Sequence, residues 1–216
     1  MILSVLKEFY EDEYSMMEYL SMGDIETFYE FVNLSPYYTN HLLGYGIIER
    51  HRDTYNFKIE SVREYLAKKL KYQKLHLTQE ETLREISERR NALEPKLRHI
   101  IRNQLRASFG KASAKNIILD ILGESRKSEL AKLSYEDLFD PNKSEIYLDD
   151  LRKIVLKNWD QFKHIFTKDK QDFDIKMQFI NKLRADAHAK NVDLDEIYYF
   201  RTCIGALEKQ IDDFLE

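Results

Sequence analysis

The sequence contains few of the residues that interrupt helices or cross-link a chain. Its 216 residues include only six glycines, three prolines and one cysteine. This scarcity of helix breakers favours long helices over many short strands. The single cysteine, Cys203, excludes an intrachain disulfide bond. It lies in an apolar helical pattern, where a small buried core residue is the usual interpretation.

Long apolar runs and a strong charge of one sign are also missing. No apolar run approaches the roughly 18 residues that a membrane-spanning helix requires. The opening segment MILSVLKEFYEDEYS has acidic residues where a secretory signal has a basic stretch. With a formal net charge of −4, contacts with phosphate must come from local basic patches. We therefore expect a cytoplasmic protein that has no membrane partner.

The residues that are present suffice for one large domain or two small ones. Hydrophobic residues make up 43% of the chain and charged residues 33%, which is ordinary for a soluble helical protein. Fourteen tyrosines and twelve phenylalanines provide ample material for a core. The chain begins directly with an apolar periodic segment, which is typical of a domain cut from a longer polypeptide.

The first third of the chain predicts three helices. Apolar side chains at spacings of three and four indicate an amphipathic helix over residues 2–20. Asp24 is a suitable N-cap for a second helix. Ser35 followed by Pro36 indicates the start of a third helix, which should extend to Gly44.

A β-hairpin should follow these helices. Residues 46–50 and 55–59 are rich in β-forming side chains, and a short polar segment separates them. Residues 60–71 then predict another helix. Three helices followed by a hairpin are the order of a winged helix-turn-helix, which we assign to residues 1–72.

This region resembles the winged-helix modules that follow the ATPase core in many bacterial P-loop NTPases. The likeness rests on residues 46–48, 55–59 and 62–66. It implies an NTPase domain in the same polypeptide. The sequence contains no G-x-x-x-x-G-K-S/T phosphate loop, so we do not expect this chain itself to hydrolyse ATP.

Residues 73–216 predict a helical bundle, which a polar and lysine-rich connector joins to the first domain. An apolar stripe indicates a long helix over residues 82–110, in which Pro95 should produce a kink or a restart. The remaining helices should cover residues 117–122, 148–166, 173–187 and 193–214. The predicted fold class is therefore mainly α.

Three polar residues near residue 180 form the candidate catalytic group. If the helix continues through His188, then Asn181, Arg184 and His188 lie one above another on one face, because their spacings are three and four. A histidine can transfer protons near neutral pH, and an arginine offers several donors to a developing phosphorane. RNA supplies its own nucleophile, the 2′-hydroxyl group. The group therefore suits RNA cleavage without a metal or another cofactor.

The second domain resembles the HEPN family (higher eukaryote and prokaryote nucleotide-binding domains). The likeness extends over roughly residues 80–214 and is carried by residues 159–166, 179–184 and 187–188. Residues 93–101 are similar to the opening helix of the family. This resemblance implies a helical bundle that forms a homodimer. In many members, paired Arg and His motifs form a metal-independent endoribonuclease site across the dimer, as in toxin and phage-defence systems.

The motif of this chain departs from the usual family pattern. Only three residues separate Arg184 from His188, and Ala185 follows the arginine where a polar residue is common. A non-catalytic dimerisation or nucleotide-binding scaffold is therefore an alternative. A purely structural role is another, with Arg184 in an ion pair and His188 at a helix end.

Other cations could contact nucleic acid. The candidates on the helical domain and on the hairpin are Lys182, Lys190, Arg98, Arg102, Arg50 and Arg52. The two hairpin arginines leave a DNA-binding regulator as a further alternative. The predicted third helix has no Arg or Lys, however, and the first helix is rich in acids, so docking to protein is favoured over binding to DNA.

Overall fold

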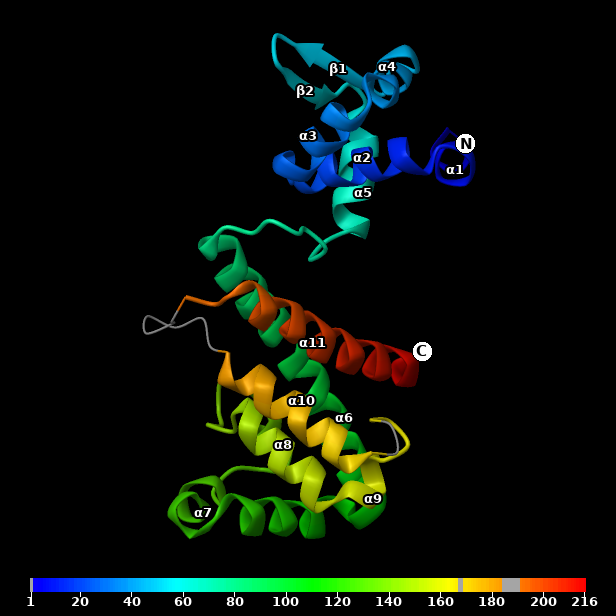
Figure 1. Ribbon diagram of the computed structural model, residues 1–216. Coiled ribbons are helices and arrows are strands. Elements are labelled where there is room, and N and C mark those ends of the chain that lie inside the picture. Colours follow the sequence, from blue (N-terminus) through cyan, green and yellow to red (C-terminus); the bar gives the residue numbers. More distant parts are fainter. Residues whose placement is uncertain (1, 167–168, 184–190) are drawn as a thin grey trace. The chain divides into compact units, whose positions relative to one another are not determined.

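The structure is a computed structural model that describes residues 2–166, 169–183 and 191–216 (Figure 1). Of these residues, 74% are helical, and the described strands form one small antiparallel sheet. The mainly helical fold class is thus confirmed. In the described part, no helix is both long and apolar enough to cross a membrane. The chain divides into two compact units, Met1–Glu81 and Thr82–Glu216.

The first unit consists of helices that surround α2, followed by a hairpin and a further helix. In chain order its elements are α1 (Ile2–Phe9), α2 (Glu11–Met22), α3 (Ile25–Leu34), α4 (Pro36–Gly44), β1 (Ile48–His51), β2 (Thr54–Phe57) and α5 (Glu60–Lys69). The α2 helix contacts all four other helices of the unit. Its Met16 and Met17 are fully buried and pack in one core with Phe28, Leu42 and Leu66.

Local signals predicted several of these elements correctly. Pro36 is the first residue of α4, and the Ser35 hydroxyl accepts a hydrogen bond from the Tyr37 amide at 3.3 Å. The hairpin is present, with Ile48 opposite Phe57. The prediction of a single helix over residues 2–20 was wrong. The backbone of Tyr10 (φ −140°, ψ 63°) separates α1 from α2.

Asp24 precedes α3, as predicted, but its carboxylate does not cap that helix. Instead it accepts hydrogen bonds from the amides of Leu75, at 3.0 Å, and His76, at 3.2 Å. The Thr27 hydroxyl donates a third at 3.2 Å. Asp24 is only 1% exposed, so these bonds replace its hydration. They fasten the segment after α5 to the first unit, whereas the sequence-based boundary at residue 72 assigned that segment to the second domain.

The second unit is built around the long helix α6. Its elements are α6 (Gln79–Leu122), α7 (Glu124–Leu130), the 3₁₀ turn η1 (Asp137–Phe139), α8 (Leu148–Lys157), α9 (Trp159–Phe162), α10 (Lys170–Lys182) and α11 (Leu194–Leu215). The α10 helix contacts both α8 and α11. Its Phe173, Met177 and Ile180 are buried in the core of the unit.

Glycine and proline affect α6 differently. Gly110 has left-handed, non-helical dihedral angles (φ 72°, ψ 162°) and divides α6 into two helical segments, so the predicted end at this residue is confirmed. The helix continues through Pro95, so of the two predicted outcomes, a kink or a restart, the restart was wrong. A proline removes one backbone hydrogen bond. The buried residues Leu93 and Leu97 on either side hold the helix in the core.

The α10 helix ends earlier than its apolar periodicity predicted. Leu183 has extended dihedral angles (φ −83°, ψ 99°), so the helix stops at Lys182 and not near Ala187. The expectation that one helix continues from Asn181 through His188 is therefore wrong at Leu183.

Four charged side chains join α6 to α11. Arg201 donates to both carboxylate oxygens of Glu85, at 2.9 and 2.6 Å, and Arg89 donates to Glu208 at 2.5 Å. Nη1 of Arg89 also lies 3.6 Å from Oε1 of Glu85. Glu85 is 4% exposed and Arg89 is 8% exposed, so this network lies inside the unit.

We expect Glu85→Ala to lower the free energy of unfolding of the second unit by roughly 3 kcal/mol, because removal of one partner leaves buried charges without compensation. The only tryptophan, Trp159, lies in this unit. Urea titration followed by tryptophan fluorescence therefore measures this unit selectively.

Lys153→Ala is the control. Lys153 is exposed and pairs with Asp149 at 2.8 Å, so its loss should change stability by less than about 0.5 kcal/mol. Equal effects of the two substitutions would contradict the role of the network.

The first unit should lose stability in acid through Asp24. Burial raises the pKa of this carboxyl group, but the hydrogen bonds from His76, Leu75 and Thr27 outweigh it and hold the pKa below 3.8. A lowered pKa stabilises the folded state above the unfolded value, and this contribution is lost as the pH falls through the folded value. Asp24→Asn should therefore reduce stability at pH 7 and flatten its decline below about pH 4. Urea titrations by circular dichroism measure both effects, and identical acid dependence in the two proteins would refute them.

Candidate functional site

The predicted catalytic residues are described only in part. Asn181 lies in the last turn of α10 and is half-buried. Arg184, His188 and Lys190 lie outside the described residues. Lys182 is described and exposed. Its Nζ lies 3.5 Å from a Glu196 carboxylate oxygen and 5.8 Å from the centre of the Phe179 ring on the same helix.

Asn181 lines a cavity of about 520 Å³, which we call the Asn181 cavity. Side chains from α6, α7 and the start of α8 converge on it. The polar residues around it are Arg90, Glu94, Arg126, Tyr147, Asp149, Asp150 and Asn181. The cavity therefore places an amide beside two guanidinium groups and three carboxylates, within the second unit.

Arg126 is held firmly at this cavity. Its Nη1 lies 2.8 Å from a carboxylate oxygen of Asp150, and its Nη2 donates to the Glu145 carbonyl. The guanidinium carbon lies 5.8 Å from the centre of the Tyr147 ring. Two of the five N–H donors of an arginine are used by these hydrogen bonds. The fixed guanidinium could therefore bind an anion in the cavity without first being ordered.

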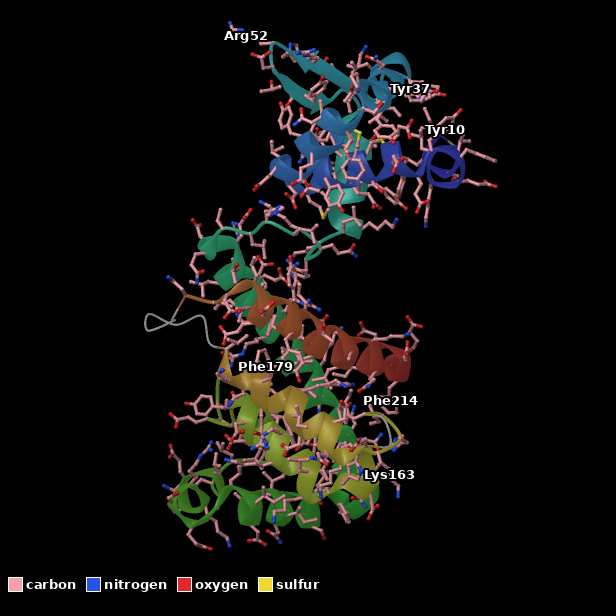
Figure 2. All side chains as sticks on the ribbon, viewed as in Figure 1. Tyr10, Tyr37, Arg52, Lys163, Phe179 and Phe214 are labelled. Carbon is pink, nitrogen blue, oxygen red and sulfur yellow. The ribbon has the colours of Figure 1, made fainter. Side chains whose placement is uncertain are left out.

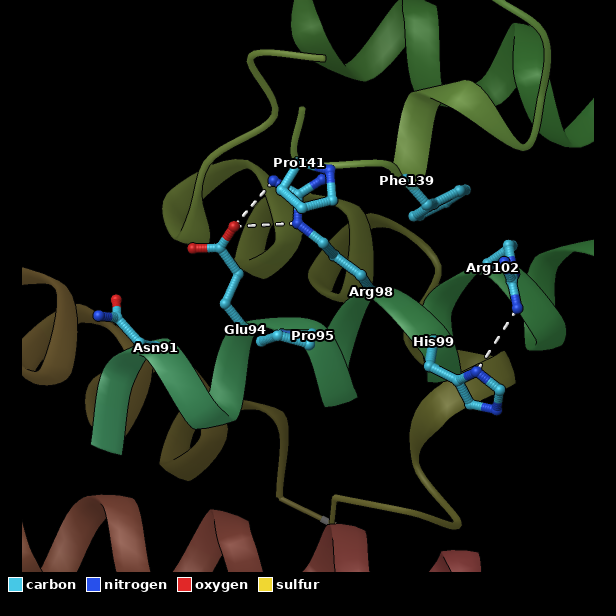
Figure 3. A pocket seen from close by; sticks show the side chains of 8 residues that line it. All are labelled: Asn91, Glu94, Pro95, Arg98, His99, Arg102, Phe139 and Pro141. Carbon is cyan, nitrogen blue, oxygen red and sulfur yellow. Dashed lines mark hydrogen bonds and ion pairs between the residues drawn. The ribbon is translucent and has the colours of Figure 1, made fainter. Parts of the chain in front are cut away.

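A second cavity, of about 440 Å³, lies further along α6, and we call it the Arg98 cavity (Figure 3). It is lined by Asn91, Glu94, Pro95, Arg98, His99, Arg102, Phe139 and Pro141. Glu94 thus borders both cavities.

Arg98 was predicted as a contact for nucleic acid, but it is not a surface residue. It is 4% exposed, and its Nε and Nη2 donate to one oxygen of Glu94 at 2.9 and 2.8 Å. Its Nη2 also donates to the Ile146 carbonyl. Arg102, one turn further along the helix, is more accessible, and its Nη2 lies 3.5 Å from the His99 ring.

The two hairpin arginines differ in how they are held. Arg52 lies at the tip of the hairpin in a left-handed conformation (φ 55°; Figure 2). The side chain of Arg50 is engaged within the hairpin. It donates to the Arg52 carbonyl at 2.9 Å, lies 3.7 Å from Asp53 and stacks 5.5 Å from the centre of the Tyr55 ring. A phosphate would have to compete with these contacts for Arg50.

Sequence reasoning missed Arg90 and Arg126 as cavity residues. A signal for Arg90 was present, because Arg90, Glu94, Arg98 and Arg102 follow one another at intervals of four residues. Arg126 had no such signal, since its position depends on the packing of α7. The described residues contain no group of three or more His, Cys, Asp or Glu side chains placed to hold a metal ion.

Comparisons with models of protein families, with curated proteins and with solved structures found no match to this chain.

Proposed function

We propose that the helical second part of the chain is a metal-independent endoribonuclease effector of the HEPN type, as in toxin and phage-defence proteins. The proposal joins the resemblance in sequence to one structural observation. Asn181, which directly precedes the segment with Arg184 and His188, lines a cavity that also contains Arg90 and Arg126. Guanidinium groups beside a polar amide suit the phosphates of an RNA strand. The first part would then be a winged-helix module, with an NTPase domain elsewhere in the polypeptide.

In this proposal the RNA 2′-hydroxyl group is the nucleophile. His188 accepts its proton while the 2′-oxygen attacks phosphorus. The bond from phosphorus to the 5′-oxygen breaks, and the leaving 5′-oxygen takes a proton from water. The products are a 2′,3′-cyclic phosphate and a 5′-hydroxyl end. Arg184 stabilises the negative charge that develops on the phosphorane. Asn181 positions the substrate, and Arg90 and Arg126 bind neighbouring phosphates.

The alternative function is a scaffold that binds a nucleotide or forms a dimer without catalysis. The carboxylates of the Asn181 cavity favour this alternative, because they offset the positive charge that would attract RNA. Asp150 in particular already forms an ion pair with Arg126 at 2.8 Å.

Cleavage of single-stranded RNA in the presence of EDTA tests the proposed function. We expect His188→Ala and Arg184→Ala each to reduce the rate by at least about a hundredfold, since proton transfer and charge stabilisation each contribute on that order. Asn181→Ala should have a smaller effect in the same direction. His164→Ala is the matched control, because His164 is exposed in the same unit and contacts Phe214.

A modified substrate and the chemistry of the product ends provide a second control. RNA with 2′-O-methyl groups should resist cleavage, and the products should carry cyclic phosphates. Failure of the folded wild-type dimer to cleave RNA would favour the scaffold. Equal loss of activity in His164→Ala would refute the assigned role of His188.

We also propose that the second unit forms a homodimer through α10 and α11. Both helices expose large apolar side chains, including Ile175, Leu194 and Tyr199, which are 48%, 55% and 44% exposed. The Tyr199 ring packs edge-on against Phe179 of α10, with 4.5 Å between ring centres, so apolar side chains of the two helices meet at this contact. Exposed apolar patches are typical of interfaces.

Ile175→Glu should therefore dissociate the dimer. Loss of two buried isoleucine side chains per dimer, at about 1.5 kcal/mol each, weakens association by roughly a hundredfold. Analytical ultracentrifugation over a concentration series measures this shift. Leu34→Glu is the control, since Leu34 is 76% exposed but belongs to the first unit. A monomeric wild-type protein, or an Ile175→Glu protein that remains as dimeric as the wild type, would contradict the proposed interface.

A further inference from the structure

The Arg98 cavity contains an unused hydrogen-bond donor. Within the described part of the chain, Nη1 of Arg98 is shielded from solvent and has no hydrogen-bond partner. Nε and Nη2 of the same group are both bonded. A buried guanidinium N–H without an acceptor is energetically costly, so an acceptor placed beside it would stabilise this region.

The charge of the cavity favours an anionic partner. Its lining contains two arginines and one histidine but only one carboxylate, that of Glu94. Glu94 is already bonded to Arg98. Arg102 therefore contributes positive charge that no carboxylate of the lining offsets.

The opposite wall of the cavity is apolar. Figure 3 shows the rings of Phe139 and Pro141 across from the helix that carries His99 and Arg102. This combination of a cationic wall and a flat apolar wall suits a ligand with a phosphate at one end and a planar ring at the other. A volume of about 440 Å³ lies in the range of small-molecule sites.

The apolar wall is fixed in place by hydrogen bonds to α6. The Tyr135 hydroxyl donates to the Arg102 carbonyl at 2.7 Å, and its ring packs edge-on against Phe139, with 5.5 Å between ring centres. Burial raises the pKa of Tyr135 to about 12, so the hydroxyl group remains a donor at neutral pH. The Ser144 hydroxyl donates to the Leu138 carbonyl at 2.6 Å and closes the loop. A ligand would thus meet a preformed cavity.

Pro95 adds a further recognition element. It lacks the N–H that would bond the Asn91 carbonyl within the helix, and both residues line the cavity. This backbone acceptor is therefore spared its helical hydrogen bond. An amino group of a base or a hydroxyl group of a ribose could donate to it.

We propose that the Arg98 cavity binds a nucleoside phosphate, either a free nucleotide or one nucleotide of an RNA strand. The phosphate contacts Arg102 and His99 and takes up the free N–H of Arg98 through a small shift of the loop at Pro141. The base lies against Phe139 and Pro141. The proposed site uses neither Arg184 nor His188, so it does not depend on whether the chain cleaves RNA.

Isothermal titration of the full chain with AMP, adenosine and inorganic phosphate tests the proposal. AMP should bind at least tenfold more tightly than adenosine or phosphate alone. Arg102→Gln should weaken AMP binding at least tenfold, because it removes a charge but leaves the Tyr135 hydrogen bond to the backbone intact. Arg98→Gln also breaks bonds to Glu94 and Ile146, so Arg102→Gln, checked for folding by circular dichroism, is the decisive variant.

Arg106→Gln is the matched control. Arg106 lies one turn further along the same helix, is exposed and does not line the cavity, so this substitution should change the affinity less than twofold. Equal losses in Arg102→Gln and Arg106→Gln, or no binding of AMP to the wild-type protein, would overturn the proposal.

Two further measurements distinguish a free nucleotide from an RNA strand as the ligand, and separate AMP binding from RNA cleavage. A ribotetranucleotide that binds more tightly than AMP would assign the site to an RNA strand, whereas equal or weaker binding would assign it to a free nucleotide. His188→Ala should retain AMP binding. The two proposals can therefore fail independently of each other.

Discussion

The buried charges between α6 and α11 determine what the rest of the second unit can do. Glu85 and Arg89 use one side of α6 for Arg201 and Glu208. Burying such ions gains little net stability, but leaving any one unpaired is expensive, so the network favours a single alignment of the two helices. This alignment commits one face of α6 to α11.

The neighbouring face of α6 is thereby left for the two cavities. Arg90, Glu94, Arg98 and Arg102 succeed one another there at intervals of four residues, so they form one row along the helix. The irregular chain between α7 and α8 closes over this row. It is attached by hydrogen bonds between side chains and backbone carbonyls, from Arg98 to Ile146 and from Tyr135 to Arg102. The first of these bonds satisfies the Ile146 carbonyl, which lies outside the regular elements.

Features that depend on a few adjacent residues could be predicted from the sequence. The start of a helix at Ser35 and Pro36 and the end of a helical segment at Gly110 were predicted correctly. Capping and the left-handed conformation of a glycine are local properties. The backbone amides that bind Asp24, those of Leu75 and His76, lie about fifty residues away, and no local pattern reveals them. The break at Tyr10 and the end of α10 at Lys182 were missed for another reason. Apolar periodicity continues past both points, although the backbone leaves the helical conformation there.

The candidate sites show the same limit of sequence reasoning. Arg98 and Arg102 are the same residue type and lie one turn apart, so their local sequence does not distinguish them. Packing makes Arg98 a buried partner of Glu94 and leaves Arg102 accessible. Arg184 and His188 lie outside the described residues, so their catalytic role stays a prediction.

Glu94 connects these observations. One of its oxygens accepts both hydrogen bonds from Arg98, and the residue also borders the Asn181 cavity. A carboxylate so placed lowers the positive potential in both cavities. Anions must therefore be held by the remaining cations, Arg102 in the Arg98 cavity and Arg90 with Arg126 in the Asn181 cavity. The α6 helix thus carries in one row both the arginines that could bind phosphate and the carboxylate, that of Glu94, which weakens their attraction for anions.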